Sequence, residues 1–284
     1  MPIRININGL ITAAGDAKVP VLDHGLLFGD SVYETLRTYH GKPFLFSRHF
    51  ARLVHSAEGI DLRLPWNKAE TLEQMRRTLL PGERRIRLMV TRGVGELSAD
   101  PETCADPAVI IMVAPLVVPP ERVYEDGADV VISSVRRSGR FADIKTGSLI
   151  HQVLALREAK MKGAFEAILL TADNKLSNGI TSNVYLVRDG KLLTPSHDAG
   201  IVAGITRGVV LDLARKMGIP VSEGFFDVSE TGSAAEMFLT STTREVVPIA
   251  RVDGKPVGTG RPGPITMRLL GAYRAAVERL IEED

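Results

Sequence analysis

Alternation of apolar and polar residues predicts strands along the N-terminal part of the chain. Residues 31–39 carry β-branched and aromatic side chains, and His40-Gly41 separates them from a second short segment, as in a hairpin. The N-terminal part should therefore be rich in strands. The expected strands cover residues 3–8, 31–39, 42–46, 85–91 and 108–113.

Capping signals predict two helices between these strands. Ser47 is a suitable N-cap for a helix that ends at Gly59. Asn67 and Glu70 have the spacing of a capping box, which predicts a second helix that runs to Leu80.

The C-terminal part mixes helices and strands without a regular alternation. Apolar positions from Ile205 to Met217 fall on one face of a helix that ends at Gly218. No internal repeat is present, so the pattern predicts an α+β fold. The other expected helices cover residues 148–162 and 265–281, and the expected strands cover residues 128–135, 165–171, 183–187, 191–194, 237–240 and 246–252.

Residues 115–120 contain three prolines, which predicts a stiff, extended segment. We interpret this segment as a linker between two domains. The predicted division is a small N-terminal α/β domain at residues 1–114 and a large C-terminal domain at residues 121–284.

Composition excludes several classes of partner. The 284 residues carry a formal net charge of +1, which provides no long-range attraction to nucleic acid or to an anionic membrane. Cys104 is the only cysteine, and the N-terminus lacks the apolar region of a signal peptide, so we expect a cytoplasmic protein. The six histidines lack metal-ligand spacing, so we expect no metal site.

The segment Asp23–Thr35 is the most informative motif, because two glycines bracket Leu-Leu-Phe before a predicted strand. Three later segments follow it in a characteristic order, at residues 144–147, 204–207 and 240–246. Together they make the chain resemble the fold-type IV pyridoxal 5'-phosphate (PLP) enzymes, the family of the D-amino-acid and branched-chain aminotransferases, and the branched-chain type more closely. The resemblance covers nearly the whole chain. It implies a two-domain fold whose large domain binds PLP, and a homodimer or higher homo-oligomer.

A PLP enzyme needs a lysine for the cofactor aldehyde and an anion site for the phosphate. The resemblance assigns the covalent role to Lys145. Gly204-Ile205-Thr206 opens an amphipathic helix, whose free N–H groups and dipole favour an anion. Thr242 and Arg52 match the family's other phosphate contacts, and the guanidinium fork of arginine suits a phosphate.

Asn178 is the sharpest departure from the family's pattern. The resemblance places a glutamate there, paired with the pyridine nitrogen of the cofactor. A carboxylate keeps that nitrogen protonated and the ring a strong electron sink, whereas a neutral amide only shares a hydrogen bond. Three explanations stay open: the enzyme tolerates the change, the chain is a variant without the acid, or its chemistry demands less of the ring.

Substrate recognition follows the resemblance in part. Tyr33 matches an active-site tyrosine that orients the lysine or the substrate. Arg87 matches an arginine of the branched-chain enzymes, although Arg85 replaces their preceding tyrosine. The backbone at Thr242-Thr243 is expected to help hold the substrate carboxylate. The Arg-x-His pair of the D-amino-acid enzymes, expected near residues 97–99, is absent.

The leading hypothesis is therefore a transaminase that moves an amino group between an amino acid, best a branched-chain or other hydrophobic L-amino acid, and a 2-oxo acid such as 2-oxoglutarate. In it Lys145 is the catalytic residue, assisted by Tyr33. The alternatives are a lyase resembling aminodeoxychorismate lyase, a D-amino-acid or amine transaminase, and a weakly catalytic PLP-binding protein. Asn178 is the only support for the last of these.

Overall fold

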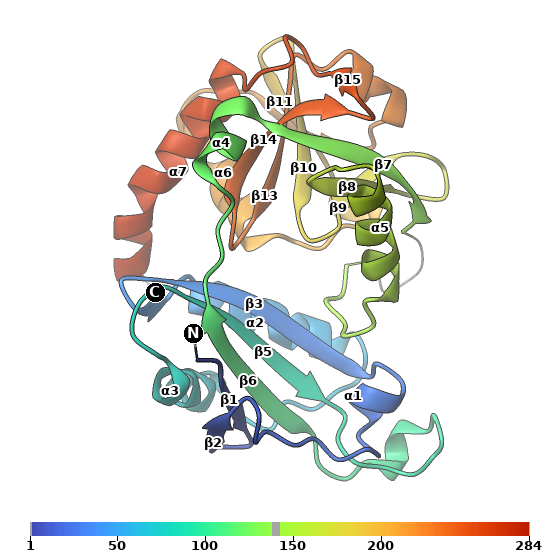
Figure 1. The fold of residues 1–284 in the computed structure, drawn as a ribbon, viewed down its shortest axis with the longest axis vertical. Coiled ribbons are helices and arrows are strands. Elements are labelled where there is room, and N and C mark those ends of the chain that lie inside the picture. The colour runs from blue at the N-terminus through green and yellow to red at the C-terminus, as the bar shows by residue number, and fades with distance from the viewer. Residues whose placement is uncertain (1, 138–142, 284) are drawn as a thin grey trace. The chain divides into compact units, whose positions relative to one another are not determined.

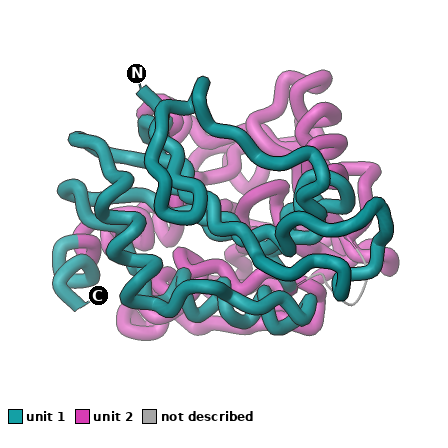
Figure 2. Tube along the Cα trace, turned by 90° about the horizontal axis from the view of Figure 1, so that it is seen from below, with its two compact units in different colours: residues 1–117, 144–148, 278–284 teal, residues 118–143, 149–277 magenta. Residues whose placement is uncertain are grey.

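Segments far apart in the sequence belong to the same structural unit. The computed structural model describes residues 2–137 and 143–283. Its contacts divide the chain into unit 1 and unit 2, which Figure 2 colours separately. Unit 1 contains Met1–Val117, Ile144–Ser148 and Glu278–Asp284, and unit 2 contains Val118–Asp143 and Leu149–Val277. The domain boundaries expected from the proline-rich segment stay a prediction.

Unit 1 is built on a six-stranded antiparallel sheet with the order β2-β1-β6-β5-β3-β4 (Figure 1). The β-branched and aromatic residues of the predicted segment 31–39 form its longest strand. The strands are β1 (Arg4–Ile7), β2 (Leu10–Ala13), β3 (Ser31–Tyr39), β4 (Lys42–Pro43), β5 (Arg84–Thr91) and β6 (Ala108–Pro115).

Two helices, α2 (Phe46–Glu58) and α3 (Lys68–Thr78), pack against this sheet and bury its core. Val32 and Leu36 of β3 belong to that core. Since strand side chains alternate between two faces, Glu34 shares the core face, and Tyr33 projects from the other face. This alternation separates two groups of functional side chains on one strand.

The predicted start of α2 is wrong. The helix begins at Phe46, and Leu45, not Ser47, is its N-cap, with a left-handed φ of 52° and no side-chain cap. Leu45 and Phe46 are both buried, so tertiary packing decides this boundary. The predicted capping box of α3 is confirmed, because Asn67 and Glu70 exchange hydrogen bonds with each other's backbone.

Unit 2 contains a nine-stranded mixed sheet with the order β12-β11-β10-β13-β14-β7-β8-β9, while β15 pairs with β14. A further pairing of β9 with β10 closes β10, β13, β14, β7, β8 and β9 into a ring. The residues at this closure are Asn178 and Asn183. The strands are β7 (Ala128–Arg136), β8 (Glu166–Leu170), β9 (Leu176–Gly179), β10 (Asn183–Arg188), β11 (Lys191–Pro195), β12 (Val221–Gly224), β13 (Glu236–Ser241), β14 (Glu245–Val252) and β15 (Lys255–Pro256).

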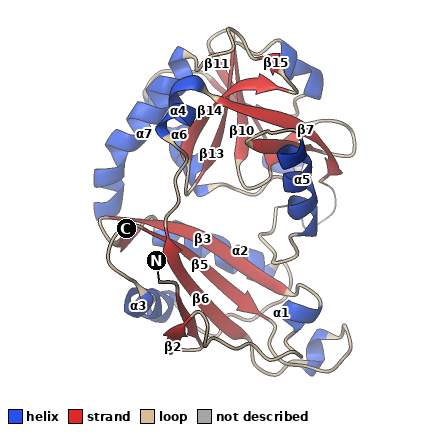
Figure 3. Ribbon diagram, in the orientation of Figure 1, coloured by secondary structure: helices blue, strands red, loops and turns tan. Residues whose placement is uncertain are grey.

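Helices and strands are mixed in both units, as the predicted α+β class requires (Figure 3). Within the described residues, none of the helices combines the length and the apolar character needed to cross a membrane. The remaining helices are α1 (His24–Leu27), α4 (Glu121–Asp126), α5 (Ile150–Met161), α6 (Ile205–Lys216) and α7 (Pro264–Glu282), with short 3-10 turns at Pro101–Thr103, His197–Ala199 and Val228–Gly232.

Candidate functional site

The segment that carries Lys145 pairs with the start of β3. The Tyr33 amide donates to the Lys145 carbonyl at 3.0 Å, and the Gly147 amide donates to the Ser31 carbonyl at 2.8 Å. A Cβ atom on Gly147 would lie 2.0 Å from Ser31 Oγ, so only glycine permits this close approach. The backbone of Lys145 is therefore fixed against the strand that bears Tyr33.

Ile144 anchors the same segment to α2. Its side chain is buried, and a Cβ atom on Gly59 would lie 2.2 Å from its Cδ1 atom. The Lys145 amide donates to Ser56 Oγ at 3.2 Å. Gly59 was predicted only as the end of a helix, and the structure shows that it also makes room for Ile144.

Lys145, Tyr33 and Arg87 come together on the face of the sheet opposite the core. Lys145 Nζ donates to Tyr33 Oη at 3.2 Å and lies 4.3 Å from the ring centroid. Arg87 reaches the same ring from β5, with its Cζ atom 3.9 Å from the centroid. Its partner on β3 is Thr35, which lies on the same face as Tyr33. The sequence predicted these three side chains for one site.

The two cations change the acidity of Tyr33. Burial opposes ionisation of the phenol, but Lys145 and Arg87 outweigh it, so the pKa of Tyr33 lies below its ordinary value. Burial also lowers the pKa of the Arg87 guanidinium, against the effect of Tyr33. The phenol is thus poised to hold the Lys145 amine through a hydrogen bond.

Glu34, which no sequence signal had singled out, organises the core face of β3. Its side chain is 0% exposed, and it accepts hydrogen bonds from Arg52 Nε at 2.6 Å, Arg52 Nη2 at 2.7 Å and His49 Nδ1 at 2.7 Å. Arg52, predicted to meet a phosphate, thus has two of its N–H groups on a carboxylate. The position of Glu34 between Val32 and Leu36 could have indicated a buried acid that needs cations.

This cluster holds its carboxylate ionised. Burial opposes the charge of Glu34, but Arg52 and His49 outweigh it and place its pKa far below the usual value. Burial lowers the pKa of His49, against the influence of Glu34. His49 Nε2 is buried and has no hydrogen-bond partner among the described residues. It is therefore a polar atom available to a bound group.

In unit 2, the start of α6 is the segment that was predicted to bind an anion. Gly204 is its N-cap and offers no side-chain acceptor, so the first backbone N–H groups, including those of Ile205 and Thr206, lack helical partners. Thr206 is buried. A Cβ atom on Gly204 would lie 1.9 Å from Asn183 Oδ1, so glycine is required here.

Thr242 and Thr243 form the turn between β13 and β14. Arg244, which follows them, forms an ion pair with Glu166 and donates to Thr181 Oγ1 at 2.8 Å. Its backbone carbonyl accepts from the Tyr124 hydroxyl at 3.1 Å. These contacts fix the end of the turn. Neither Arg244 nor Glu166 was predicted from the sequence.

Asn178 is buried on β9 beside the β10 residue Asn183. Asn183 Nδ2 donates to Asn178 Oδ1 at 3.1 Å and to the Val202 carbonyl at 3.0 Å. The structure therefore supplies an amide pair at the position where the resemblance expects an acid.

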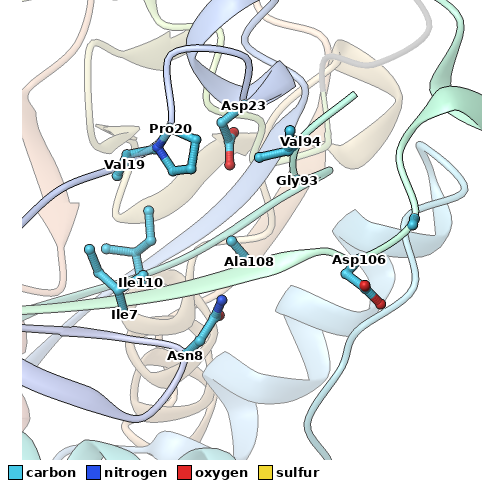
Figure 4. Close-up of a pocket in the computed structure, with 11 residues that line it drawn as sticks. Ile7, Asn8, Val19, Pro20, Asp23, Gly93, Val94, Asp106, Ala108 and Ile110 are labelled. Carbon is cyan, nitrogen blue, oxygen red and sulfur yellow. The ribbon is translucent and has the colours of Figure 1, made fainter. Parts of the chain in front are cut away.

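A cavity of about 340 Å³ in unit 1 lies apart from these residues (Figure 4). Its lining includes Asp23, Val94 and Ile110, and none of the candidate site residues. The Asp23 carboxylate already accepts from the Gly25 amide and the Thr91 hydroxyl, each at 2.8 Å. In the described part of the chain, no cluster of three His, Cys, Asp or Glu side chains could hold a metal ion.

Comparison with known proteins identifies the family. The model of the amino-transferase class IV family matches residues 31–252. The chain belongs to this family. It is 36% identical over 278 residues, 96% of each chain, to a Methanocaldococcus jannaschii protein whose provisional name is branched-chain-amino-acid aminotransferase. It is also 37% identical over 287 residues to the D-alanine aminotransferase of Listeria innocua, which covers 99% of this chain and 98% of that protein.

A solved structure gives the same result. The T.th. branched-chain amino acid aminotransferase, crystallised with pyridoxamine 5'-phosphate, has a TM-score of 0.89 and 29% identity, covering 96% of this chain and 93% of that one. The predicted family, fold class, PLP cofactor and transaminase activity are therefore confirmed. The protein is a PLP-dependent class IV aminotransferase that acts on an amino acid and a 2-oxo acid.

Proposed function

We propose that this aminotransferase moves the amino group of a branched-chain or other hydrophobic L-amino acid to 2-oxoglutarate. The observation that carries the proposal is Arg87, held 3.9 Å from the Tyr33 ring that also contacts Lys145. A guanidinium held beside the reacting amine suits the second carboxylate of 2-oxoglutarate, the one remote from its oxo group. The absence of an Arg-x-His pair near residues 97–99 supports the L-amino acid over the D-amino acid.

PLP supplies an electrophilic aldehyde and an electron-withdrawing ring. In the proposed site Lys145 would hold the aldehyde, and Asn178 would meet the ring nitrogen. The Ile205 and Thr206 amides, Thr242 and Arg52 would hold the phosphate. Two observations support the fit: the α6 N-terminus requires glycine at its N-cap, and the buried His49 Nε2 beside the Glu34–Arg52 pair has no protein partner in the described chain.

Lys145 also performs the proton transfer in this proposal. With PLP bound, its Nζ atom would take the proton from the α-carbon of the amino donor. Tyr33, whose hydroxyl accepts from Nζ at 3.2 Å, orients the amine for this transfer. The backbone at Thr242-Thr243, whose turn ends at the anchored Arg244, binds the α-carboxylate of the substrate.

D-amino acids are the second candidate for the donor. The observation in their favour is the 37% identity to the Listeria innocua D-alanine aminotransferase. An amine transaminase and a lyase that eliminates pyruvate are the remaining alternatives, and the same assay distinguishes them.

The test is an amino-donor screen with 2-oxoglutarate and pyruvate as acceptors, covering branched-chain, aromatic and D-amino acids and chiral amines. We expect branched-chain L-amino acids with 2-oxoglutarate to react fastest. D-alanine as the best donor, or pyruvate released without an acceptor, would contradict the proposal.

Arg87→Gln tests the carboxylate role directly. Loss of a charge-assisted contact worth roughly 1.5–3 kcal/mol should raise KM for 2-oxoglutarate about 10- to 150-fold. Arg85→Gln is the matched control, because Arg85 lies on the same strand and is exposed. An equal effect of both changes would refute the role of Arg87.

A homodimer and a cytoplasmic location complete the proposal. The helix α5 supports self-association, because it buries only Ala155 and Ala159 and exposes apolar side chains on its other faces. Such a surface on a helix indicates a partner. The exposed residues are Ile150, Val153, Leu154, Leu156 and Met161.

A further inference from the structure

Asn178 and Asn183 form the rung that closes the ring of strands in unit 2. Both side chains are almost completely buried, with exposures of 4% and 5%. Buried amides are costly unless their hydrogen-bonding groups are matched, donor to acceptor. The packing of β9 against β10 must therefore fix which of the two amides donates the hydrogen bond and which accepts it.

A backbone carbonyl determines that direction. The Val202 carbonyl can only accept, so the Asn183 atom 3.0 Å from it is Nδ2. The second hydrogen of the same Nδ2 points to Asn178 at 3.1 Å and needs an acceptor, which is Oδ1. Asn183 Oδ1 lies against Gly204, where a Cβ atom would approach it to 1.9 Å. Asn183 is thus held in a single orientation.

The fixed orientation of Asn183 determines where Asn178 Nδ2 points. With Oδ1 committed to Asn183, Nδ2 faces away from it and has no acceptor among the described residues. The opposite rotamer would put the two Nδ2 groups against each other, with no acceptor between them. Position 178 therefore presents a donor, where a carboxylate would present an acceptor.

We propose that Asn183 holds Asn178 as a hydrogen-bond donor, so that the pyridine nitrogen of PLP is bound unprotonated, as an acceptor. This inference rests on the proposed function, which puts Asn178 at that nitrogen. If the pyridine nitrogen were protonated, its N–H would face the N–H of Asn178. Two donors would then meet in a buried site without an acceptor between them. Asn183 is the positioning residue, and it acts through Asn178.

An unprotonated ring withdraws electrons less strongly than a pyridinium. Transamination passes through an α-carbanion whose charge spreads into the ring, so the amide pair would lower the rate of transamination.

The experiment uses PLP labelled with ¹⁵N in the ring and bound to the whole protein. Borohydride reduction and peptide mapping first establish that the cofactor is on Lys145. A label elsewhere overturns the proposed function and this inference with it. The ring-nitrogen chemical shift is then measured over a range of pH, with free labelled PLP in acid and in base as references.

The wild-type protein should show the shift of an unprotonated nitrogen at neutral pH. A pyridinium shift in the wild-type protein with Lys145 labelled overturns the inference and leaves the proposed function standing. In Asn178→Glu the pKa of the ring nitrogen should rise by about one to three units, as expected beside a carboxylate. The wild-type measurement decides the question even if that variant does not fold.

Asn183→Asp tests the positioning role. A carboxylate at 183 can only accept, so Asn178 should rotate, donate to it and turn Oδ1 toward the ring. The nitrogen should then move toward the protonated shift, although residue 183 itself does not touch the cofactor. Adding Asn178→Ala should abolish this movement. If the movement persists in the double variant, the new charge acts directly on the ring and the positioning role is wrong.

Discussion

Glu34→Gln removes the charge that holds together the core face of β3. The carboxylate is 0% exposed and receives both Arg52 Nε and Nη2 and His49 Nδ1, at 2.6–2.7 Å. Arg52 is itself only 10% exposed. The glutamine keeps the size of the side chain but leaves the guanidinium without its counter-charge, in a place that water hardly reaches.

Breaking a buried ion pair by removing one partner costs about 3–5 kcal/mol. At roughly 2–4 °C per kcal/mol, the Tm should fall by roughly 6–20 °C. PLP affinity should fall as well, because the proposed phosphate ligand Arg52 loses its support.

The stability that the Glu34 carboxylate contributes should decrease as the pH falls. The pKa of Glu34 is depressed in the folded protein, so its stabilising contribution is complete above the usual value of 4.5 and is lost as pH falls toward the folded value. The difference in unfolding free energy between wild type and variant should therefore narrow below about pH 4.5. His49, whose pKa is lowered by burial, makes the wild type lose stability on acidification from about pH 6.5.

Thermal unfolding of the PLP-free proteins, followed by circular dichroism across this pH range, measures both effects. Glu278→Gln is the control, because Glu278 also pairs with a histidine, His40, at 2.8 Å, but with exposures of 74% and 65%. Exposed pairs contribute at most about 1 kcal/mol. Equal shifts in Tm for the two variants would refute the importance of the buried cluster.

Three further predictions concern the site and the assembly. The wild-type pH profile of kcat/KM should fall on an alkaline limb below pH 10.0, since Lys145 and Arg87 outweigh burial and lower the pKa of Tyr33. Tyr33→Phe should remove this limb, and an unchanged limb would exclude Tyr33 as its source. Asn178→Glu should raise the single-turnover transamination rate about tenfold or more, and unchanged rates in a folded, PLP-loaded variant would mean that another residue serves the ring nitrogen. Sedimentation should give a homodimer that Val153→Lys on α5 weakens, whereas an active wild-type monomer at assay concentration would contradict the assembly.

Local sequence signals predicted the parts of the fold that local chemistry determines. The strand at residues 31–39 has the predicted bounds, and the capping box of α3 forms as expected. In contrast, β9 was not predicted, because Leu-Ser-Asn-Gly has little strand propensity and is extended only by pairing with β8 and β10. The start of α2 was wrong because burial of Leu45 overrides the capping preference of Ser47.

The candidate site also contains some residues that the sequence predicted and others whose roles depend on tertiary packing. The order of the motifs sufficed to predict that Lys145, Tyr33 and Arg87 belong to one site. In the structure, Lys145 and Arg87 both contact the Tyr33 ring. The cluster around Glu34 depends on which face of β3 meets α2, and this arises from tertiary packing. The orientation of the Asn178 amide depends on a backbone carbonyl at Val202, far from it in the sequence. No pattern of residue types reports such a contact.

Reductive trapping tests whether this aminotransferase binds PLP covalently through Lys145. The PLP-loaded protein is treated with borohydride, digested and mapped by mass spectrometry, with Lys145→Ala as the control. The pyridoxyl group should appear on the peptide that contains Lys145 in the wild type and be missing from the variant. A pyridoxyl group on another lysine of the wild type, or none in the loaded protein, would exclude Lys145 as the covalent site.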